Sequence, residues 1–356
     1  MEPLKNHYNY EYVSRLGRVL AESQAPFSIE DFVAGVMGTD WEDLELKQRM
    51  RRITTTMRDV LPQDYKSAIA ILNKAAASFE GFLAMFFPEY IELYGLDDWE
   101  TSLPALGWMT RFSSSEFAVR PFIKKDSERM MAQMMAWAED ENYHVRRLAS
   151  EGCRPRLPWA MALPHFKRDP APILPILEKL KADPEEYVRR SVANNLNDIS
   201  KDHPDLALEI SKRWLGHSSE TDWIVKHACR TLLKAGRPEA MLLFGYGAPD
   251  RVEVNNARIE HAKLEIGGEQ YFSFDITVPE PMKLRLEYAV NYVKANGSTS
   301  RKVFKISETE YKRGTTGITR KQKFADLSTR KHYAGEHRIE ILINGVSKAE
   351  VSFELL

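Results

Sequence analysis

Two stretches of the sequence carry adjacent arginines at matching places in a helical pattern. Aligning Val145 with Val188 superimposes the pair Arg146-Arg147 on the pair Arg189-Arg190. The guanidinium group matches the geometry of phosphate, so the repeated pairs predict a surface that binds a polyanion. Because successive residues point about 100° apart on a helix, at least one arginine of each pair faces elsewhere. The alternative is that these arginines are ordinary solvated surface residues.

The pairs belong to a longer repeat. A third copy follows at Asp222–Leu233, and Val225 extends the aligned valines at intervals of 43 and 37 residues. This period is typical of HEAT-like repeats, in which stacked helix pairs share a core and leave a concave face for a ligand. Apolar residues recur at helical spacing from about Tyr10 to Ala240.

The chain changes character near residues 246–250. Further on, segments such as Tyr271–Val278 and Arg338–Ile343 alternate with period two, and turn signals such as Asn344-Gly345 separate them. About seven short strands in roughly 105 residues fit an immunoglobulin-like sandwich. We therefore predict a mainly α protein, with a HEAT-like helical-repeat solenoid at 1–246 and a smaller all-β immunoglobulin-like sandwich at 250–356.

The distribution of charge favours a nucleic-acid partner in one region of the chain, although the net charge does not. The formal net charge is −1, but residues 250–356 carry +3 and the rest −4, and residues 301–331 hold ten basic against three acidic side chains. A local basic surface can act whatever the total charge. The two cysteines, Cys153 and Cys229, lie in helical patterns and support neither a disulfide framework nor a zinc site.

Several familiar signals are absent from the sequence. It has no Walker loop, no G-x-G-x-x-G after a strand, no H-E-x-x-H and no G-x-S-x-G, and its nine histidines lack metal-ligand spacing. We expect no metal or organic cofactor. Neither a signal peptide nor a membrane-spanning run is evident, so we expect a cytoplasmic protein. We also expect the protein to be a monomer.

Asp198 ends the run Asn194-Asn195-Leu-Asn-Asp198, away from the apolar stripe that Val188 begins on the same expected helix. Asn and Asp are poor residues for a helix interior because their side chains compete for backbone hydrogen bonds. The run therefore indicates either a frayed last turn or a functional carboxylate held in a cationic groove.

Glu116 and Trp159 each allow two interpretations. Ser113-x-x-Glu116 has the pattern of a capping box, which satisfies backbone N–H groups and needs no chemistry. Trp159 follows Arg154-Pro-Arg-Leu-Pro158, a loop stiffened by two prolines. It is either a packing anchor or an aromatic ring held in place for catalysis.

Three segments carry a resemblance to a known family. They are Ser-Glu-Phe-Ala-Val-Arg-Pro-Phe around Glu116, His-Val-Arg-Arg-Leu-Ala-Ser-Glu-Gly-Cys-Arg-Pro-Arg-Leu-Pro-Trp ending at Trp159, and Tyr-Val-Arg-Arg-Ser-Val-Ala-Asn-Asn-Leu-Asn-Asp ending at Asp198. These segments resemble the AlkC family of DNA alkylation-repair glycosylases, which has a HEAT-like fold related to AlkD, in the subset with a C-terminal immunoglobulin-like domain.

The resemblance implies a function and a site. The implied activity is removal of the positively charged bases 3-methyladenine, 3-methylcytosine and 1-methyladenine from duplex DNA, without flipping the base into a deep pocket. The implied catalytic residues are Glu116, Asp198 and Trp159. Candidate DNA contacts in the helical part are Arg146, Arg154, Arg156, Arg189, Arg190, Asn194, Lys226 and Arg230. Arg301, Lys302, Lys312 and Arg313 of the sandwich are expected to hold the opposite side of the duplex, at the minor groove.

Two other functional classes remain open. A HEAT-like scaffold could hold DNA or a protein partner and catalyse nothing, in which case Asp198 and Glu116 would be dispensable. A purely structural solenoid for protein assembly would not bind DNA specifically at any salt concentration.

Overall fold

The structure, a computed structural model, describes residues 2–23, 27–327 and 330–356. Its contacts fall into two compact units, residues 1–203 with 214–228, and residues 204–213 with 229–356. The first unit is helical, and the second joins a few helices to two β-sheets. The predicted fold class, helical repeats followed by an all-β sandwich, is confirmed. In the part of the chain that the structure describes, no helix is both long and apolar enough to cross a membrane.

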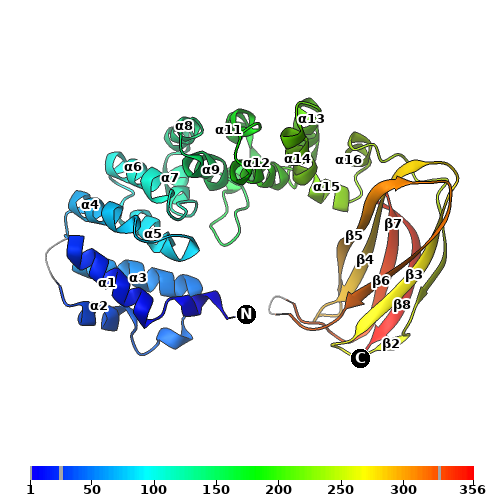
Figure 1. The fold of residues 1–356 in the computed structure, drawn as a ribbon, viewed down its shortest axis with the longest axis horizontal. Coiled ribbons are helices and arrows are strands. Elements are labelled where there is room, and N and C mark those ends of the chain that lie inside the picture. Colours follow the sequence, from blue (N-terminus) through cyan, green and yellow to red (C-terminus); the bar gives the residue numbers. More distant parts are fainter. Residues whose placement is uncertain (1, 24–26, 328–329) are drawn as a thin grey trace. The chain divides into compact units, whose positions relative to one another are not determined.

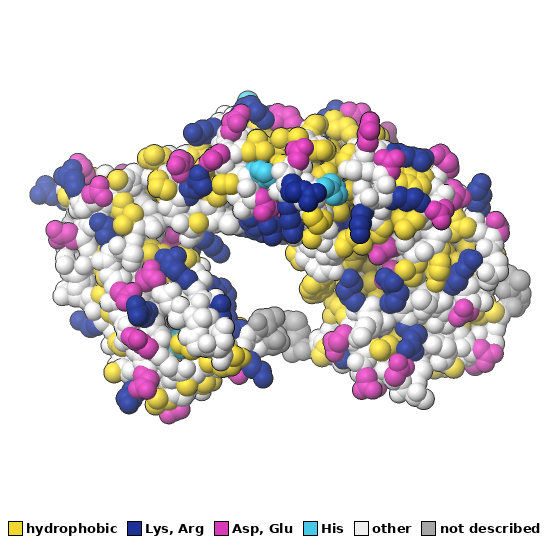
Figure 2. Space-filling model, turned by 180° about the vertical axis from the view of Figure 1, so that it is seen from behind, with side chains coloured by type: hydrophobic (Ala, Val, Ile, Leu, Met, Phe, Trp, Pro, Cys, Tyr) yellow, Lys and Arg dark blue, Asp and Glu magenta, His cyan; other side chains and the backbone are white. Residues whose placement is uncertain are grey.

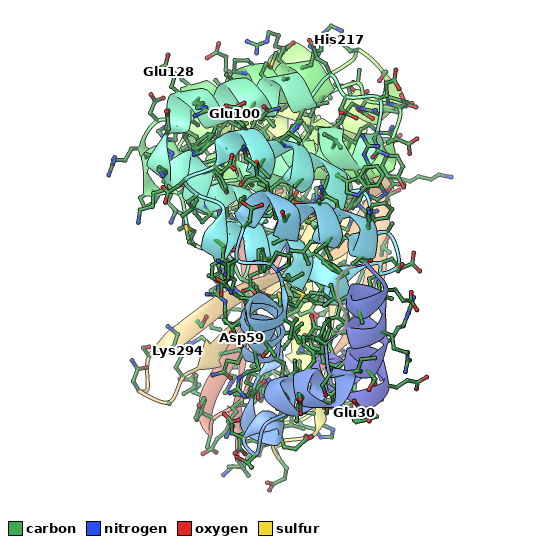
Figure 3. The ribbon with its side chains drawn as sticks, turned by 90° about the vertical axis from the view of Figure 1, so that its left-hand side faces the viewer. Glu30, Asp59, Glu100, Glu128, His217 and Lys294 are labelled. Atoms are coloured by element: carbon green, nitrogen blue, oxygen red, sulfur yellow. The ribbon has the colours of Figure 1, made fainter. Side chains whose placement is uncertain are left out.

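The first unit is a stack of helices that follow one another along the chain (Figure 1). Each packs mainly on near neighbours in the sequence, as α9 packs on α12 and α12 on α14. Figure 3 shows the stack from one end, with its levels marked by Glu30, Asp59, Glu100 and Glu128. The bounds are Tyr10–Ser23 (α1), Ile29–Val36 (α2), Leu46–Val60 (α3), Tyr65–Ala76 (α4), Phe86–Tyr94 (α5), Trp99–Met109 (α6), Val119–Lys125 (α7), Ser127–Trp137 (α8), Tyr143–Gly152 (α9), Pro164–Arg168 (α10), Leu174–Leu180 (α11), Glu186–Ile199 (α12) and Ser219–Ala228 (α14), with 3-10 turns at Leu4–His7 (η1), Trp41–Asp43 (η2), Phe82–Met85 (η3) and Ala171–Ile173 (η4).

The three aligned valines occupy equivalent places in this stack. Val145, Val188 and Val225 are almost completely buried on α9, α12 and α14. On α12 the whole apolar stripe from Val188 to Ile199 is buried, as its helical period predicts. Apolar burial at matching repeat positions is what joins successive levels of such a stack.

Two sheets form the sandwich of the second unit. The strands are Glu253–Ile259 (β1), Lys263–Leu264 (β2), Glu269–Val278 (β3), Met282–Val293 (β4), Thr299–Tyr311 (β5), Gly314–Lys323 (β6), Gly335–Ile343 (β7) and Val346–Leu355 (β8). One sheet has the order β1-β3-β6 and the other β2-β8-β7-β4-β5. All pairs are antiparallel except β2 with β8. A shared apolar core that includes Phe274, Leu286 and Ile341 lies between the sheets.

The hydrophobic pattern misses β6. This strand contains one buried side chain, Ile318, so it shows no apolar alternation. It is a strand because its backbone pairs with β3 along its full length, from Gly314 opposite Val278 to Lys323 opposite Glu269. The pattern also predicts separate strands at 251–254 and 258–260, but they form the single strand β1, interrupted by a bulge.

A contact between two glycines ties the last helices to the sandwich within the second unit. Gly236 lies between α15 (Arg230–Lys234) and α16 (Pro238–Leu243), and Gly345 lies in the β7–β8 turn. A Cβ atom on Gly345 would stand 2.4 Å from the Cα atom of Gly236. Asn344 fastens the same turn, because its side-chain amide donates to the Gly247 carbonyl at 2.8 Å. The remaining helix, α13 (Pro204–Trp214), is linked to this segment by an ion pair between Asp205 and Arg237 at 2.6 Å.

We predict that Gly345→Ala lowers the free energy of unfolding by about 1–3 kcal/mol more than Gly297→Ala, because overpacking a filled site costs that much. Gly297 is the matched control, since its φ of +75° is close to the +81° of Gly345 and a Cβ atom added there would meet nothing within 4 Å. Urea denaturation of the three proteins measures the difference. Equal losses would mean that the left-handed backbone alone, and not the contact with Gly236, constrains residue 345.

Candidate functional site

Six charged side chains of alternating sign form one chain of ion pairs, here called the ion chain. Glu116 pairs with Arg147, Arg147 with Glu151 at 3.5 Å, Glu151 with Arg154 at 2.6 Å, Arg154 with Asp198 at 2.9 Å, and Asp198 with Lys201 at 2.9 Å. The first five side chains are 2–14 % exposed, and Lys201 is 38 % exposed. The two carboxylates singled out in the sequence, Glu116 and Asp198, thus belong to one electrostatic unit.

Helical spacing explains the middle of the ion chain. Arg147 and Glu151 are four residues apart on α9, so their side chains share one face of the helix. Arg154 lies in the loop just after α9 and pairs with Glu151 from there. Burial raises the pKa of Glu151, but Arg147 and Arg154 outweigh it and hold that pKa below its ordinary value. Burial lowers the pKa of Arg154, but Glu151 and Asp198 more than offset this and leave it raised. Glu151 and Arg154 are therefore both charged at neutral pH.

Asp198 lies in the last turn of α12, and this turn does not fray. The helix runs to Ile199, and both Asn195 and Asp198 are fully buried. Asn195 donates from Nδ2 to the carbonyl of Ser150 on α9 at 2.7 Å, which explains an asparagine at that place. The frayed-turn interpretation is therefore wrong. Asp198 is a buried carboxylate whose two oxygens each accept a charged hydrogen bond.

Glu116 lies in the turn before α7 and does not form a capping box. The hydroxyl of Ser113 donates to the carbonyl of Met109, and no side chain caps α7. The carboxylate of Glu116 instead accepts hydrogen bonds from Arg147 and from Ser114 Oγ at 2.8 Å. The capping interpretation is therefore wrong, and Glu116 forms one end of the ion chain.

Trp159 is not a packing anchor. Its side chain is 65 % exposed, and its φ of +63° lies in the left-handed region that a bulky residue rarely adopts. The ring meets Phe82 of η3 edge-on, with 5.6 Å between centroids. Packing does not explain an exposed aromatic ring on a strained backbone. Backbone strain of this kind is common at functional sites.

Two cations from earlier in the chain hold the loop that carries Trp159. Arg120 on α7 is completely buried and donates to the carbonyls of Arg154 at 2.9 Å and Met161 at 2.7 Å. Burial lowers the pKa of Arg120 to about 10, so it stays charged at neutral pH. Lys47 on α3 donates to the carbonyl of Trp159 itself at 2.8 Å. The loop is thus fastened on both sides of the tryptophan and at the tryptophan.

The first arginine of each repeated pair has the same structural role. Arg146 donates to the carbonyls of Asp140 and Glu141, and Arg189 donates to those of Asp183 and Pro184, all at 2.7–3.0 Å. These carbonyls lie six and five residues before each arginine. Arg146 also pairs with the Asp183 carboxylate at 2.6 Å. The first arginine therefore fastens the loop in front of its own helix, and its contact with phosphate stays a prediction.

The second arginine of each pair differs between the repeats. Arg147 is buried in the ion chain, whereas Arg190 is exposed and pairs with Glu186 one turn away on α12. The second arginine stands at the same place in both repeats. It is therefore a member of the ion chain in one repeat and a surface cation in the other.

The other predicted contacts of the helical part are spread over several elements. Arg156 pairs with Asp202 at 2.6 Å, Asn194 hydrogen-bonds His227 at 3.1 Å, Lys226 is half-buried on α14, and Arg230 begins α15 of the second unit. Figure 2 shows Lys and Arg side chains gathered in a dark blue group on the helical unit, near α12. The group gives this unit a local cationic surface.

The predicted DNA contacts of the sandwich lie on β5 and in the turn that follows it. Arg301 pairs with Glu340 at 3.0 Å, and the Lys302 ammonium lies over the Phe304 ring at 5.2 Å. Lys312 and Arg313 are exposed between β5 and β6. Residues 328 and 329 of the basic segment 301–331 lie outside the described residues. DNA contacts by all of these side chains remain predictions.

Sequence reasoning missed several members of the site. Glu151 could have been found from its spacing, because it stands four residues after Arg147 on the expected helix. No sequence signal links Lys47 to Trp159 or Arg120 to Met161, since these contacts join distant parts of the chain. Within the described ranges, no group of three or more His, Cys, Asp or Glu side chains is arranged to hold a metal ion.

Comparison with known proteins gives matches to both parts of the chain. Residues 102–232 match the family model described as DNA alkylation repair enzyme, and residues 253–356 match that of the C-terminal Ig-like domain of YhaZ. The uncharacterized protein YhaZ of Bacillus subtilis (strain 168) is 47% identical over 356 residues, which is 100% of both chains.

A solved structure matches over the same full length. The alkylpurine DNA glycosylase AlkC of Pseudomonas fluorescens, bound to DNA containing an abasic site analog, superimposes with a TM-score of 0.95 at 38% identity, covering 100% of both chains. The resemblance seen in the sequence is confirmed. The chain therefore belongs to the AlkC family of DNA alkylation repair proteins, among the members with a C-terminal immunoglobulin-like domain.

Proposed function

We propose that this protein is a DNA glycosylase that hydrolyses the N-glycosidic bond of cationic alkylated bases in duplex DNA and so begins base excision repair. The substrates are 3-methyladenine, 3-methylcytosine and 1-methyladenine. The observation that carries the proposal is the full-length match, at a TM-score of 0.95, to a glycosylase held on DNA with an abasic site analog. An abasic site is what remains when a glycosylase has removed a base.

The chemistry of these lesions suits the residue types of the site. Methylation of a ring nitrogen gives the base a positive charge, so it leaves without protonation by a general acid. Positive charge then develops on the sugar. A preorganised carboxylate stabilises that charge and orients the attacking water. Glu116 and Asp198 take these roles in the proposal.

The ion chain supports these roles by holding both carboxylates in place. Each carboxylate is fixed by an arginine, and Glu151 fixes both arginines in turn. A carboxylate held in this way needs little reorganisation when charge appears on the sugar. The side chain of Glu116 is 14 % exposed, whereas that of Asp198 is 2 % exposed. Glu116 is therefore the carboxylate assigned to the attacking water.

The proposal gives Trp159 and the two domains complementary tasks. The exposed ring of Trp159 contacts the cationic base or the deoxyribose, where an aromatic face contributes on the order of 1–2 kcal/mol. Residues 1–246 bind the duplex and carry the chemistry without a deep base pocket. Residues 250–356 act as an accessory DNA-binding domain through Arg301, Lys302, Lys312 and Arg313.

We predict that Asp198→Asn and Glu116→Gln each slow the release of 3-methyladenine and 3-methylcytosine from methylated duplex DNA while leaving duplex affinity nearly unchanged. The loss is expected to be on the order of 10²-fold or more, the range for removing one preorganised electrostatic group. Chromatography of released bases measures excision, and fluorescence anisotropy measures binding.

A matched control separates chemistry from folding. Asp202→Asn removes a carboxylate that pairs with Arg156 nearby but lies outside the ion chain, so its excision rate should stay near that of the parent. Thermal melting of each variant shows whether it is folded. If folded Asp198→Asn and Glu116→Gln proteins keep the parent rate, the non-catalytic scaffold is the better description.

We predict that Trp159→Leu slows excision about tenfold, since the aromatic face contributes on the order of 1–2 kcal/mol to a cationic ligand. Trp159→Phe should keep part of that rate because it keeps an aromatic face. Trp223→Leu is the control, because Trp223 is also a partly exposed tryptophan but lies on α14. Single-turnover excision kinetics give the three rates. Similar slowing at positions 159 and 223 would remove Trp159 from the proposed site.

We predict that the double variant Lys312→Ala/Arg313→Ala lowers the slope of log affinity against log salt concentration by about 1.8, because each lost phosphate contact removes about 0.9. The control is Arg251→Ala/Lys263→Ala, which removes two highly exposed cations of the second unit elsewhere. Anisotropy titrations over a range of salt concentrations give the slopes. An unchanged slope in the first variant would take the β5–β6 turn out of the DNA interface.

A further inference from the structure

A hollow lies in the helical unit near the ion chain. It has a volume of about 700 Å³, and its wall includes Tyr12, Arg15, Arg111, His144 and Tyr187. This is within the range of roughly 300–1,000 Å³ that is typical of small-ligand sites. The catalytic scheme above uses none of these five residues.

The wall of the hollow includes partly exposed aromatic rings. Tyr187 is 41% exposed, and Tyr143, next to His144 in the chain, is 37% exposed. The His144 ring lies 4.1 Å from that of Tyr143 and 5.7 Å from that of Tyr187, measured between centroids. A group of partly exposed rings is a surface on which a flat apolar group can stack.

The wall also includes two arginines. Arg15 lies over the ring of Phe79 at 4.8 Å, and Arg111 lies over that of Trp108 at 5.2 Å. Both arginines are exposed. A guanidinium that stacks by its face keeps N–H donors around its edge, in the geometry that phosphate accepts.

One aromatic side chain of the wall, Tyr187, contacts the ion chain. The Arg147 guanidinium, which pairs with Glu116, lies 4.9 Å from the centre of the Tyr187 ring. Ser113, three residues before Glu116, also lines the hollow. A ligand stacked on Tyr187 would therefore lie one side chain away from the arginine that orients Glu116.

We propose that this hollow binds one unstacked nucleotide of the DNA, with its base against the rings of His144 and Tyr187 and its phosphate on Arg15 and Arg111. The inference rests on the proposed function, which supplies DNA as the partner. Aromatic rings combined with arginines are the features with which proteins bind unpaired nucleotides. The position beside Glu116 places this nucleotide near the site of base removal.

Photo-cross-linking tests whether a nucleotide of the DNA occupies the hollow. Duplexes with an abasic-site analogue carry 5-iododeoxyuridine at one flanking position at a time, on either strand, and cross-linked peptides are identified by mass spectrometry. The proposal expects one flanking position to cross-link to the peptides that contain His144 or Tyr187. If every flanking position cross-links elsewhere, the proposal is overturned.

Arginine variants provide a second, independent measurement. The double variant Arg15→Ala/Arg111→Ala should weaken binding to the same duplex and lower its salt slope by roughly 0.7–0.9, the value of one phosphate contact. Arg129→Ala is the control, because Arg129 is also exposed and lies 4.5 Å over a tryptophan, Trp99, away from the hollow. An unchanged slope for the double variant would overturn the proposal, as would an equal change in the control.

Excision by the unmodified protein distinguishes the two proposals. Base release without a cross-link in the hollow refutes the nucleotide site and leaves the glycosylase proposal intact. A cross-link in the hollow without base release refutes the glycosylase activity and leaves the nucleotide site.

Discussion

Burying a charge in a protein costs several kcal/mol of desolvation unless an opposite charge or hydrogen bonds compensate for it. In this structure that constraint extends over Glu116, Arg147, Glu151, Arg154 and Asp198, and it ends at Lys201, which reaches solvent. Every interior member satisfies two neighbours of opposite sign. Losing a member therefore removes a compensating charge from each of its neighbours. The constraint therefore couples the turn before α7, helix α9, the loop after it and helix α12.

Several other features of the helical unit follow from this coupling. The Asn195 amide joins α12 to the end of α9 beside the ion chain, and this contact accounts for a polar residue inside a helix. Arg120 binds the carbonyl of Arg154, a member of the ion chain, and that of Met161 further along the loop. The backbone that orients Asp198 through Arg154 is thus the same backbone that presents Trp159. A rigid pair of carboxylates and an exposed ring are the parts that stabilising a developing positive charge requires.

The sequence predicted the framework of the fold well, because the framework depends on local periodicity. The helical spacing and the alternation of most strands depend on residues close together in the sequence, and the aligned valines follow from a repeat of residue types. The strand β6 could not be read in this way, since it has one buried side chain and owes its conformation to pairing with β3. The same limit applied to Glu116. A serine three residues before a glutamate is a local capping pattern, but the carboxylate found a stronger partner in Arg147, from another helix.

The sequence by itself determined the helical repeats, the sandwich and the family, and it singled out Glu116, Trp159 and Asp198. Repeats and motifs are carried by residue type and spacing, which need no coordinates. The tertiary structure decided what each charged residue does. The two arginine pairs have the same sequence, but their members differ in role. Arg146 and Arg189 fasten loops. Arg147 pairs with Glu116 in the ion chain, whereas Arg190 lies at the surface. The physical reason is that the energy of a charge depends on its burial and its partners, and both are set by residues far away in the chain.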